Sequence, residues 1–267
     1  MKGKRLDQRL TELGLAESRE KAKATIMSGL VYVNGQKSDK PGTPVADDAE
    51  IEVRGAACPY VSRGGFKLAK ALESFGIAPE GWVCIDCGAS TGGFTDVLLK
   101  NGAAKVYAVD VGYGQLAWSL RTDGRVVVME RTNARGLTPD MFPERMDMAV
   151  MDLSFISIRL VLPAVRALVK DGGRCVCLIK PQFEAGKADV GKKGVVRDRA
   201  VHERVLREMT EFFPTAGWKL TGLDYSPIRG PEGNIEYLAC LSAEEGPGVE
   251  PDIAAIVAAS HGELDKG

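Results

Sequence analysis

Four charged residues stand where apolar runs begin or end, and together they could move a proton. Asp152 and Lys180 each follow an apolar run, Glu236 stands at the start of another, and Lys67 follows a Ser-Arg-Gly-Gly-Phe segment. A single charged strand end is more often a solvated terminus than a functional group. Lys180 is the sharper case, because a lysine between five apolar residues and a proline lies at a pocket mouth. Its ammonium then needs an acidic partner.

A glycine-rich turn between an apolar strand and an apolar helix pattern could hold a cofactor. The turn spans residues 88–94 after Asp86, and Asp110 ends the next predicted strand. Glycines let a backbone approach its ligand, and a carboxylate after the second strand can hold ribose hydroxyls. The turn is neither the dinucleotide fingerprint G-x-G-x-x-G nor a P-loop with its phosphate-binding lysine. An acidic strand end repels a pyrophosphate but suits a sulfonium and an amino group, which predicts S-adenosylmethionine as the cofactor.

Strands and helices must alternate to position these residues. The apolar patterns predict strands at 82–86, 106–110, 126–130, 147–152, 174–180, 218–225 and 235–241, and helices at 65–76, 92–101, 114–121, 156–170 and 198–212. Such alternation predicts a parallel sheet with helices on both faces. The last two strands are joined by residues 227–233 without a helix, so we expect an antiparallel hairpin. The predicted fold is α/β, a Rossmann-like seven-stranded methyltransferase sheet with an antiparallel last strand, preceded by a small α+β domain.

This topology would gather the charged residues at one edge. Ligands of open α/β sheets bind outside the carboxyl ends of the parallel strands. Asp86, Asp110, Asp152 and Lys180 all fall at that edge, and an antiparallel last strand begins there with Glu236.

Composition argues against several other classes of protein. With 267 residues, 45% hydrophobic and 27% charged, the chain can form one substantial domain and a small one. It shows no signal peptide and no apolar run of spanning length, so we expect a cytoplasmic protein. Cys84 and Cys87 match C-x-x-C but straddle a strand end, which favours buried structural cysteines over a redox pair. With only two histidines, we expect no metal site.

Positive charge gathers at the N-terminal end. Residues 1–40 hold nine Lys/Arg against five Asp/Glu, whereas residues 243–267 hold six acidic residues and one lysine. Two amphipathic helix patterns, at 5–15 and from Ser18 to Gly29, precede a strand that runs into Asn34-Gly35. A charge run alone is more often a solvated face than an RNA site.

The order of residues in this region carries more information than its charge. Arg5-Leu-Asp-x-x-Leu, Leu13-Gly-Leu-x-x-Ser-Arg19, Gly29-x-Val-x-Val-Asn-Gly35 and Lys40-Pro41 together resemble the RNA-binding domain named after the fourth protein of the small ribosomal subunit. That domain presents basic helices to structured RNA, largely through phosphates. The resemblance implies RNA contacts from these residues: Lys4, Arg5, Arg9, Arg19, Lys21, Lys23 and Arg63.

Residues 4–242 as a whole resemble the TlyA family of ribosomal RNA 2′-O-methyltransferases, historically also labelled haemolysins. The runs that carry the resemblance are Val61-Ser-Arg-Gly-Gly-Phe-Lys67-Leu, Asp86-Cys-Gly-Ala-Ser-Thr-Gly-Gly-Phe94, Asp110-Val-Gly-Tyr-Gly-Gln115-Leu, Asp152-Leu-Ser-Phe-Ile156, Lys180-Pro-Gln-Phe-Glu184 and Gly230-Pro-x-Gly-Asn-x-Glu236. The resemblance implies an RNA-binding domain at 1–55, a linker at 56–60, an FtsJ-like catalytic domain at 61–242 and an acidic tail at 243–267. A short helix near 253–259 is expected within that tail.

The resemblance also implies roles for the residues. The catalytic tetrad of FtsJ-like enzymes maps onto Lys67, Asp152, Lys180 and Glu236, with Lys180 as the base that draws off the proton of a ribose 2′-hydroxyl. The implied cofactor contacts are Asp86, Gly88, Ala89, Ser90, Thr91, Gly92, Gly93, Phe94, Asp110, Asn133 and Asp152. The implied substrate is cytidine in small- and large-subunit ribosomal RNA, within ribosomal subunits.

Two other functions stay open at this point. One is a membrane-active haemolysin, which the lack of an export signal and of a strongly amphipathic cationic helix opposes. The other is an RNA-binding ribosome assembly factor that has kept the cofactor pocket but lost turnover, which the complete tetrad opposes.

Overall fold

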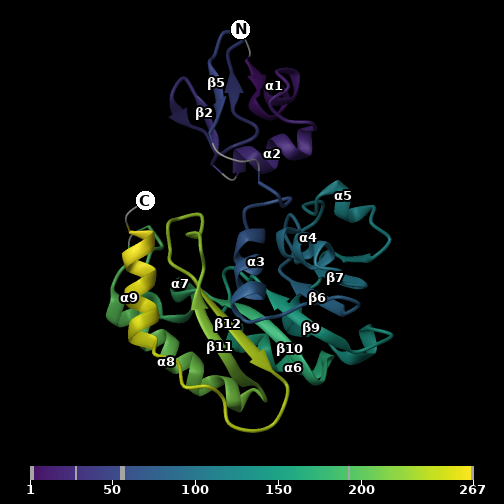
Figure 1. Ribbon diagram of the computed structural model, residues 1–267, viewed down its shortest axis with the longest axis vertical. Helices are drawn as coiled ribbons and strands as arrows, with labels where there is room; N and C mark the ends of the chain where they lie inside the picture. The colour runs from purple at the N-terminus through teal and green to yellow at the C-terminus, as the bar shows by residue number, and fades with distance from the viewer. Residues whose placement is uncertain (1–2, 28, 55–57, 192, 266–267) are drawn as a thin grey trace.

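The protein forms a small N-terminal lobe above a larger α/β lobe (Figure 1). The structure, a computed structural model, describes residues 3–27, 29–54, 58–191 and 193–265. Residues 55–57, which include part of the expected linker, lie outside the described residues. We call residues 3–54 the head and, after the role expected from the sequence, residues 58–243 the catalytic domain.

The head is a helical pair packed on short strands. Its elements are β1 (Lys4–Arg5), α1 (Leu6–Glu12), α2 (Arg19–Met27), β2 (Val31–Val33), β3 (Gln36–Lys37), β4 (Pro44–Val45) and β5 (Ile51–Val53). β2 pairs antiparallel with β3 and β5, and β1 with β4. The expected turn at Asn34-Gly35 joins β2 to β3, and both residues have the positive φ that a tight hairpin requires. Leu6, Leu10 and Ile26 are fully buried and give the head a core of its own.

The catalytic domain alternates strands and helices as predicted. Its elements are α3 (Gly65–Ser74), β6 (Val83–Cys87), α4 (Gly93–Lys100), β7 (Lys105–Val109), α5 (Trp118–Arg121), β8 (Val126–Met129), β9 (Met146–Met151), α6 (Leu162–Leu168), β10 (Val169–Ile179), α7 (Pro181–Glu184), α8 (Arg199–Thr215), β11 (Lys219–Tyr225) and β12 (Tyr237–Ser242), with α9 (Ile253–Leu264) following.

Seven strands of this domain form one sheet in the order β11-β12-β10-β9-β6-β7-β8. Only β12 runs against the others, pairing antiparallel with both β10 and β11. The predicted sheet with an antiparallel last strand is thus confirmed. The chain moves outward from β6 through β7 to β8 and then crosses to β9 on the other side of β6. A crevice for a ligand is expected at such a switch point.

Helices cover both faces of the sheet. Apolar residues of α3, α4 and α5, such as Leu68, Val97 and Leu120, pack on one face, and those of α6, α8 and α9, such as Leu162, Val205 and Val257, pack on the other. Figure 1 shows α9 lying along α8 beside the β11–β12 hairpin. Because both faces are covered, a ligand can reach the sheet only at the ends of its strands.

Two predicted helices are shorter than expected. The helix expected at 114–121 is only α5, because Gly114 has a left-handed backbone, with φ +71°, and Ala117 is extended, with ψ 141°, so the helix begins at Trp118. The helix expected at 156–170 is α6, preceded by a 3-10 turn at Ile158–Leu160, and the last of its expected residues belong to β10 instead.

The segment after residue 243 contains more structure than its acidic composition predicts. Helix α9 ends at Leu264, five residues beyond the expected end, because its apolar face packs on the core through Val257, Ile253 and Ile256. Glu263 of this helix and Asp265 just after it also have partners, Tyr225 and Arg229 respectively. Composition alone misses this, because it does not show what a helix face packs against.

Cys84 and Cys87 both lie on β6 and are fully buried. Burial raises the pKa of the Cys84 thiol to about 12, so these are unreactive core residues, in line with the sequence reading. Within the described ranges, no helix has both the length and the apolarity to cross a membrane.

Candidate active site

The four charged residues of the predicted tetrad meet at one edge of the sheet. Asp152 directly follows β9 and Lys180 directly follows β10, while Glu236 directly precedes β12. Tyr237 of β12 pairs with Ile179 of β10, so the antiparallel strand begins where its neighbour ends. Lys67 reaches this edge from α3.

Lys67 lies at the centre of the cluster. Its Nζ is 2.6 Å from Glu236 Oε2 and 3.2 Å from Asp152 Oδ2. Lys180 Nζ is 2.6 Å from Asp152 Oδ1 and donates a hydrogen bond to Ser154 Oγ at 3.0 Å. The two lysines are each 6% exposed and Glu236 is fully buried. The sequence prediction that these four residues come together is consistent with this geometry.

The two lysines differ in their surroundings. Burial disfavours the Lys67 ammonium, but attraction to Asp152 and Glu236 outweighs it and raises the pKa of Lys67. Burial likewise acts against the Asp152 carboxylate, yet Lys67 and Lys180 lower its pKa below the usual value. Lys67 is therefore a fixed cation held by two carboxylates, whereas Lys180 pairs with one carboxylate among the described residues. Lys180 is therefore the less constrained of the two lysines.

Glu236 keeps one oxygen free. Its Oε2 binds Lys67, while Oε1 is buried and accepts no hydrogen bond from the described residues. Gly230 packs against this oxygen so closely that a Cβ there would lie 2.6 Å from Oε1. The structure thus places a carboxylate oxygen without a hydrogen-bond donor in the group that also holds the Lys67 ammonium, an arrangement able to accept a hydrogen bond from a bound hydroxyl.

The glycine-rich turn connects β6 to α4 at the same edge. Gly88 has φ +88°, and a Cβ there would come within 2.7 Å of the Asp152 carbonyl oxygen. A Cβ at Gly93 would lie 2.9 Å from the Gly65 backbone nitrogen. Only glycine fits either position, so the turn can pack its backbone directly against the tetrad. Ala89 and Phe94 are buried in the core, whereas Ser90 is exposed.

Two aspartates flank this turn. Asp86 is fully buried, and its Oδ2 accepts hydrogen bonds from the backbone nitrogen and hydroxyl of Thr95, at 2.9 and 2.7 Å. Its Oδ1 has no partner among the described residues. Burial raises the pKa of Asp86 to about 7, with nearby Asp152 adding to the rise and Thr95 opposing it. Asp110, just beyond β7, accepts the backbone N–H groups of Ser90 at 2.8 Å and Gly112 at 2.6 Å.

Asn133 lies farther along the same edge. It follows β8, is exposed, and its side chain accepts the backbone N–H of Arg135 at 3.0 Å, which caps a short 3-10 turn. Thr91, Gly92 and the other residues of the predicted cofactor set belong to the turn itself.

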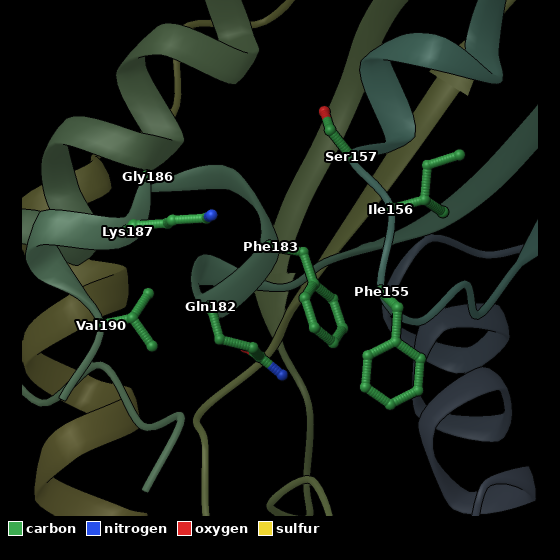
Figure 2. A pocket seen from close by; sticks show the side chains of 8 residues that line it. All are labelled: Phe155, Ile156, Ser157, Gln182, Phe183, Gly186, Lys187 and Val190. Carbon is green, nitrogen blue, oxygen red and sulfur yellow. The ribbon is translucent and has the colours of Figure 1, made fainter. Parts of the chain in front are cut away.

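A pocket of about 430 Å³ opens beside the tetrad and was not predicted from the sequence (Figure 2). Phe155 and Phe183 border it, with ring centroids 5.5 Å apart, and the side chain of Lys187 lies across from them. Phe155 is 92% exposed and has φ +66°, so a strained backbone holds an apolar ring in solvent. The one feature of the sequence that could have indicated a role for Phe155 is its position, three residues after Asp152.

Glu184 connects the two segments that line this pocket, one after Asp152 and the other after Lys180. It accepts hydrogen bonds from Ser157 Oγ at 2.6 Å and from the Ile158 backbone nitrogen at 2.9 Å. The segment after Asp152 is thereby fixed to the segment after Lys180. Ser154, which binds Lys180, is a further site residue that the sequence analysis missed.

In the head, two of the predicted RNA-binding arginines share one buried anchor. Asp7 is fully buried and binds Arg5 through both carboxylate oxygens, each at 3.0 Å, and Arg19 at 3.2 Å. The two arginines keep about half of their side chains exposed. Neighbouring Lys4 is exposed and binds Glu12.

Arg9 differs from these residues, because its side chain is 14% exposed and is held by Glu12 and the Asp47 carbonyl oxygen. Arg9 therefore contributes to the packing of the head, and its contact with RNA stays a prediction.

Two further predicted RNA contacts, Lys21 and Lys23, lie at the junction of the lobes. Lys21 and Lys23 line a cleft of about 730 Å³ together with Lys100 and the exposed Trp118 of the catalytic domain. Arg63 lies two residues before α3 and has no ion-pair partner among the described residues.

Comparison with known proteins agrees with this division. An FtsJ-like methyltransferase model matches residues 60–243, and an S4 domain model matches residues 4–51. The chain belongs to the TlyA family of FtsJ-like methyltransferases.

Individual relatives of this TlyA-family protein match over nearly their whole length. The 16S/23S rRNA (cytidine-2′-O)-methyltransferase TlyA of Mycobacterium tuberculosis is 49% identical, over 90% of each chain. The protein YqxC of Bacillus subtilis, named as an rRNA methyltransferase, is 52% identical over 97% of this chain and 95% of its own. A solved structure from Streptococcus thermophilus that carries a hemolysin name is 47% identical, with TM-score 0.81, and covers 100% of this chain and 98% of its own.

The TlyA-family site is built from lysines, carboxylates and backbone groups. Among the described residues there is no group of three or more His, Cys, Asp or Glu side chains that could hold a metal ion. In this site the ammonium groups of Lys67 and Lys180 balance the carboxylates of Asp152 and Glu236 through direct ion pairs.

This balance predicts how the domain responds to a lost charge. Replacing Lys67 by methionine leaves Glu236 buried without a cation and should destabilise the catalytic domain by about 3–5 kcal/mol. The double variant Lys67→Met/Glu236→Gln should recover much of that loss. Urea unfolding followed by fluorescence reports this domain, since all three tryptophans (Trp82, Trp118, Trp218) lie in it. Equal stability of the single variant and the wild type would contradict the described network.

Proposed function

We propose that this protein transfers a methyl group from S-adenosylmethionine to the ribose 2′-hydroxyl of ribosomal RNA. One observation carries the proposal. The cluster of Lys67, Asp152, Lys180 and Glu236 stands beside a glycine-rich turn, in a chain whose head is an S4 domain. Its TlyA relative is named for cytidine in 16S and 23S rRNA, and we propose the same nucleoside for this chain.

The residues at the sheet edge fit S-adenosylmethionine, which supplies a methyl group as an electrophile on a sulfonium. The turn at 88–94 places its backbone groups beside Asp152. We propose that these backbone groups contact the methionine moiety of the cofactor. The unpartnered Oδ1 of Asp86 suits an ammonium group. Asp110 would hold the ribose, since each of its oxygens retains a second lone pair beside its backbone hydrogen bond. Asn133 would border the adenine.

Lys180 acts as the general base. A ribose hydroxyl has a pKa far above neutrality, so a base must take its proton as the oxygen attacks the methyl carbon. The neutral amine of Lys180 accepts that proton, and Asp152 at 2.6 Å stabilises the resulting ammonium. Ser154 fixes the direction of the amine through its hydrogen bond. The fixed cation Lys67 and the free oxygen of Glu236 hold the attacking ribose in place.

The aromatic pocket receives the target base. Phe155 and Phe183 offer ring faces next to the tetrad, and an exposed ring three residues from Asp152 can stack on a base turned out of its helix. Lys187 at the pocket rim is suited to a phosphate.

The head brings the catalytic domain to folded RNA. Arg5 and Arg19, held by Asp7, present two guanidinium groups from one anchor and suit phosphate oxygens. We propose residues 1–55 as the RNA-binding unit, 56–60 as the linker and 61–242 as the catalytic unit, working on ribosomal subunits in the cytoplasm. The complete tetrad favours an enzyme over a non-catalytic assembly factor.

Replacing the base tests the mechanism. Lys180→Arg keeps the positive charge beside Asp152 but cannot release its proton at working pH. We expect methyl transfer to fall about 10²–10⁴-fold in single-turnover assays on ribosomal subunits, with cofactor affinity within a few fold of wild type. The matched control is Lys170→Arg, at the opposite end of β10, where the lysine binds Asp147. Retained activity in Lys180→Arg would make Lys180 an electrostatic anchor.

Asp86 predicts a pH dependence of cofactor binding. Its pKa of about 7 means that the carboxylate forms as pH rises toward neutrality, and only the carboxylate attracts an ammonium group. Affinity for S-adenosylmethionine should therefore rise by up to about tenfold per unit below about pH 7 and level off above it. Calorimetric titrations across this range measure the effect. Asp86→Asn should flatten the profile, whereas Asp147→Asn, at the other end of the sheet, should not. A flat wild-type profile would remove Asp86 from the cofactor site.

The head predicts a salt-dependent contribution to RNA affinity. Each phosphate contact that is lost reduces the slope of log affinity against log salt by about 0.7–0.9. Arg5→Gln/Arg19→Gln, whose amide groups can still donate hydrogen bonds to the buried Asp7, should therefore weaken rRNA binding and reduce this slope by roughly 1.4–1.8. Filter binding at several salt concentrations measures the slope. Arg207→Ala, which removes an exposed arginine on α8, is the control. An unchanged slope in the double variant would show that the two arginines do not contact phosphates.

A further inference from the structure

The last turns of α9 grip the hairpin that carries Glu236. Glu263 accepts a hydrogen bond from the Tyr225 hydroxyl at the end of β11. At the start of β12, the Tyr237 hydroxyl lies 3.2 Å from Ser260 Oγ. We call residues 226–236, between these two anchors, the Glu236 loop. Helix α9 thus holds the chain immediately before and immediately after this loop.

Arg229 makes the third and most extensive contact. It donates to the Leu264 carbonyl oxygen through Nε at 3.0 Å and Nη2 at 2.7 Å, and it also binds the Asp265 carboxylate. Its Nη1 donates to the Gly233 carbonyl oxygen at 3.3 Å. A cation at a helix C-terminus satisfies carbonyl groups that lack partners within the helix. One guanidinium therefore joins the end of α9 to the middle of the Glu236 loop.

The loop transmits this constraint to the carboxylate. Gly230, next to Arg229, accepts from the Gly233 nitrogen and donates to the Asn234 carbonyl oxygen, both at 2.9 Å. The Glu236 carbonyl oxygen accepts the Ser226 backbone N–H at 2.8 Å. Gly230 also lies against Glu236 Oε1, as described above. A shift of Arg229 would therefore move the backbone that limits where this carboxylate can lie.

We propose that Arg229 is a positioning residue for methyl transfer and that α9 is the support through which it sets the place of Glu236. The proposal rests on the proposed function for the role of Glu236 but not for the bracing itself. The proposal assigns a structural role to α9, a helix within the segment that the sequence composition indicated to be an acidic tail. Arg229 does not reach the reacting atoms, so it acts only through the Glu236 loop.

The test compares two arginines that clamp opposite ends of the same hairpin. Arg229→Met removes the clamp at the Glu236 loop. The control Arg166→Met removes a similar one, because Arg166 binds the carbonyl oxygens of Gly217 and Ala243 at the far end. Misplacing a catalytic group by about 1 Å can slow a reaction about 10²-fold. We expect Arg229→Met to lower kcat roughly 10- to 100-fold with KM for S-adenosylmethionine within about twofold. Arg166→Met should keep kcat within about twofold at a comparable change in Tm.

A double-variant cycle separates positioning from general destabilisation. If Arg229 acts through Glu236, Arg229→Met should cause no further loss of kcat in a Glu236→Gln background. Losses that multiply would overturn the proposal, as would an unchanged kcat in Arg229→Met.

Hydrogen exchange gives a readout that does not depend on the proposed reaction. Arg229→Met should speed exchange in residues 226–237 and leave the β6 strand at 83–87 unchanged. Unchanged exchange in residues 226–237 would overturn the bracing even for an active enzyme. Faster exchange in a protein with no activity on ribosomal RNA would instead contradict the proposed function and leave the brace confirmed.

Discussion

The burial of Lys67 between two carboxylates is the constraint on which the site depends. An ammonium group at 6% exposure is tolerable only when nearby negative charge replaces its lost hydration. Asp152 and Glu236 supply that charge from β9 and β12, and Asp152 shares its other oxygen with Lys180. Two lysines and two carboxylates thereby close into one cluster. Each member fixes the others, so the strand ends and α3 must keep their relative positions.

The reversed direction of β12 makes this closure possible. If β12 were parallel to β10, Glu236 would begin at the opposite edge of the sheet, the length of a strand away from Asp152. The reversal has a cost, since the segment before β12 must loop over the sheet edge with a buried carboxylate at its end. Contacts from α9, through Tyr225, Arg229 and Tyr237, hold this segment. The position of Glu236 therefore depends on how α9 packs against the domain.

The charged cluster and the glycine-rich turn occupy different parts of the same sheet edge. Lys180 and Phe155 lie beyond β10 and β9, whereas Asp86, the glycine-rich turn and Asp110 belong to β6 and β7. Asp152 stands between the two groups, and its carbonyl oxygen packs on Gly88 while its carboxylate binds both lysines. A donor and an acceptor bound on either side would meet at this residue. The arrangement explains why glycine is required at position 88.

The sequence by itself determined the alternating pattern, the glycine-rich turn and the residue types of the tetrad, because periodicity and strand-end chemistry are local properties. The sequence also predicted the fold of the head, because the order of its motifs can be recognised without knowing any long-range contact. Only the tertiary structure decided that Lys67 is the fixed cation and Lys180 the less constrained one, since that difference depends on which carboxylates lie within about 3 Å of each. It likewise decided the aromatic pocket, the packing role of Arg9 and the extent of α9. These features come from contacts between segments far apart in the chain, which no local pattern encodes.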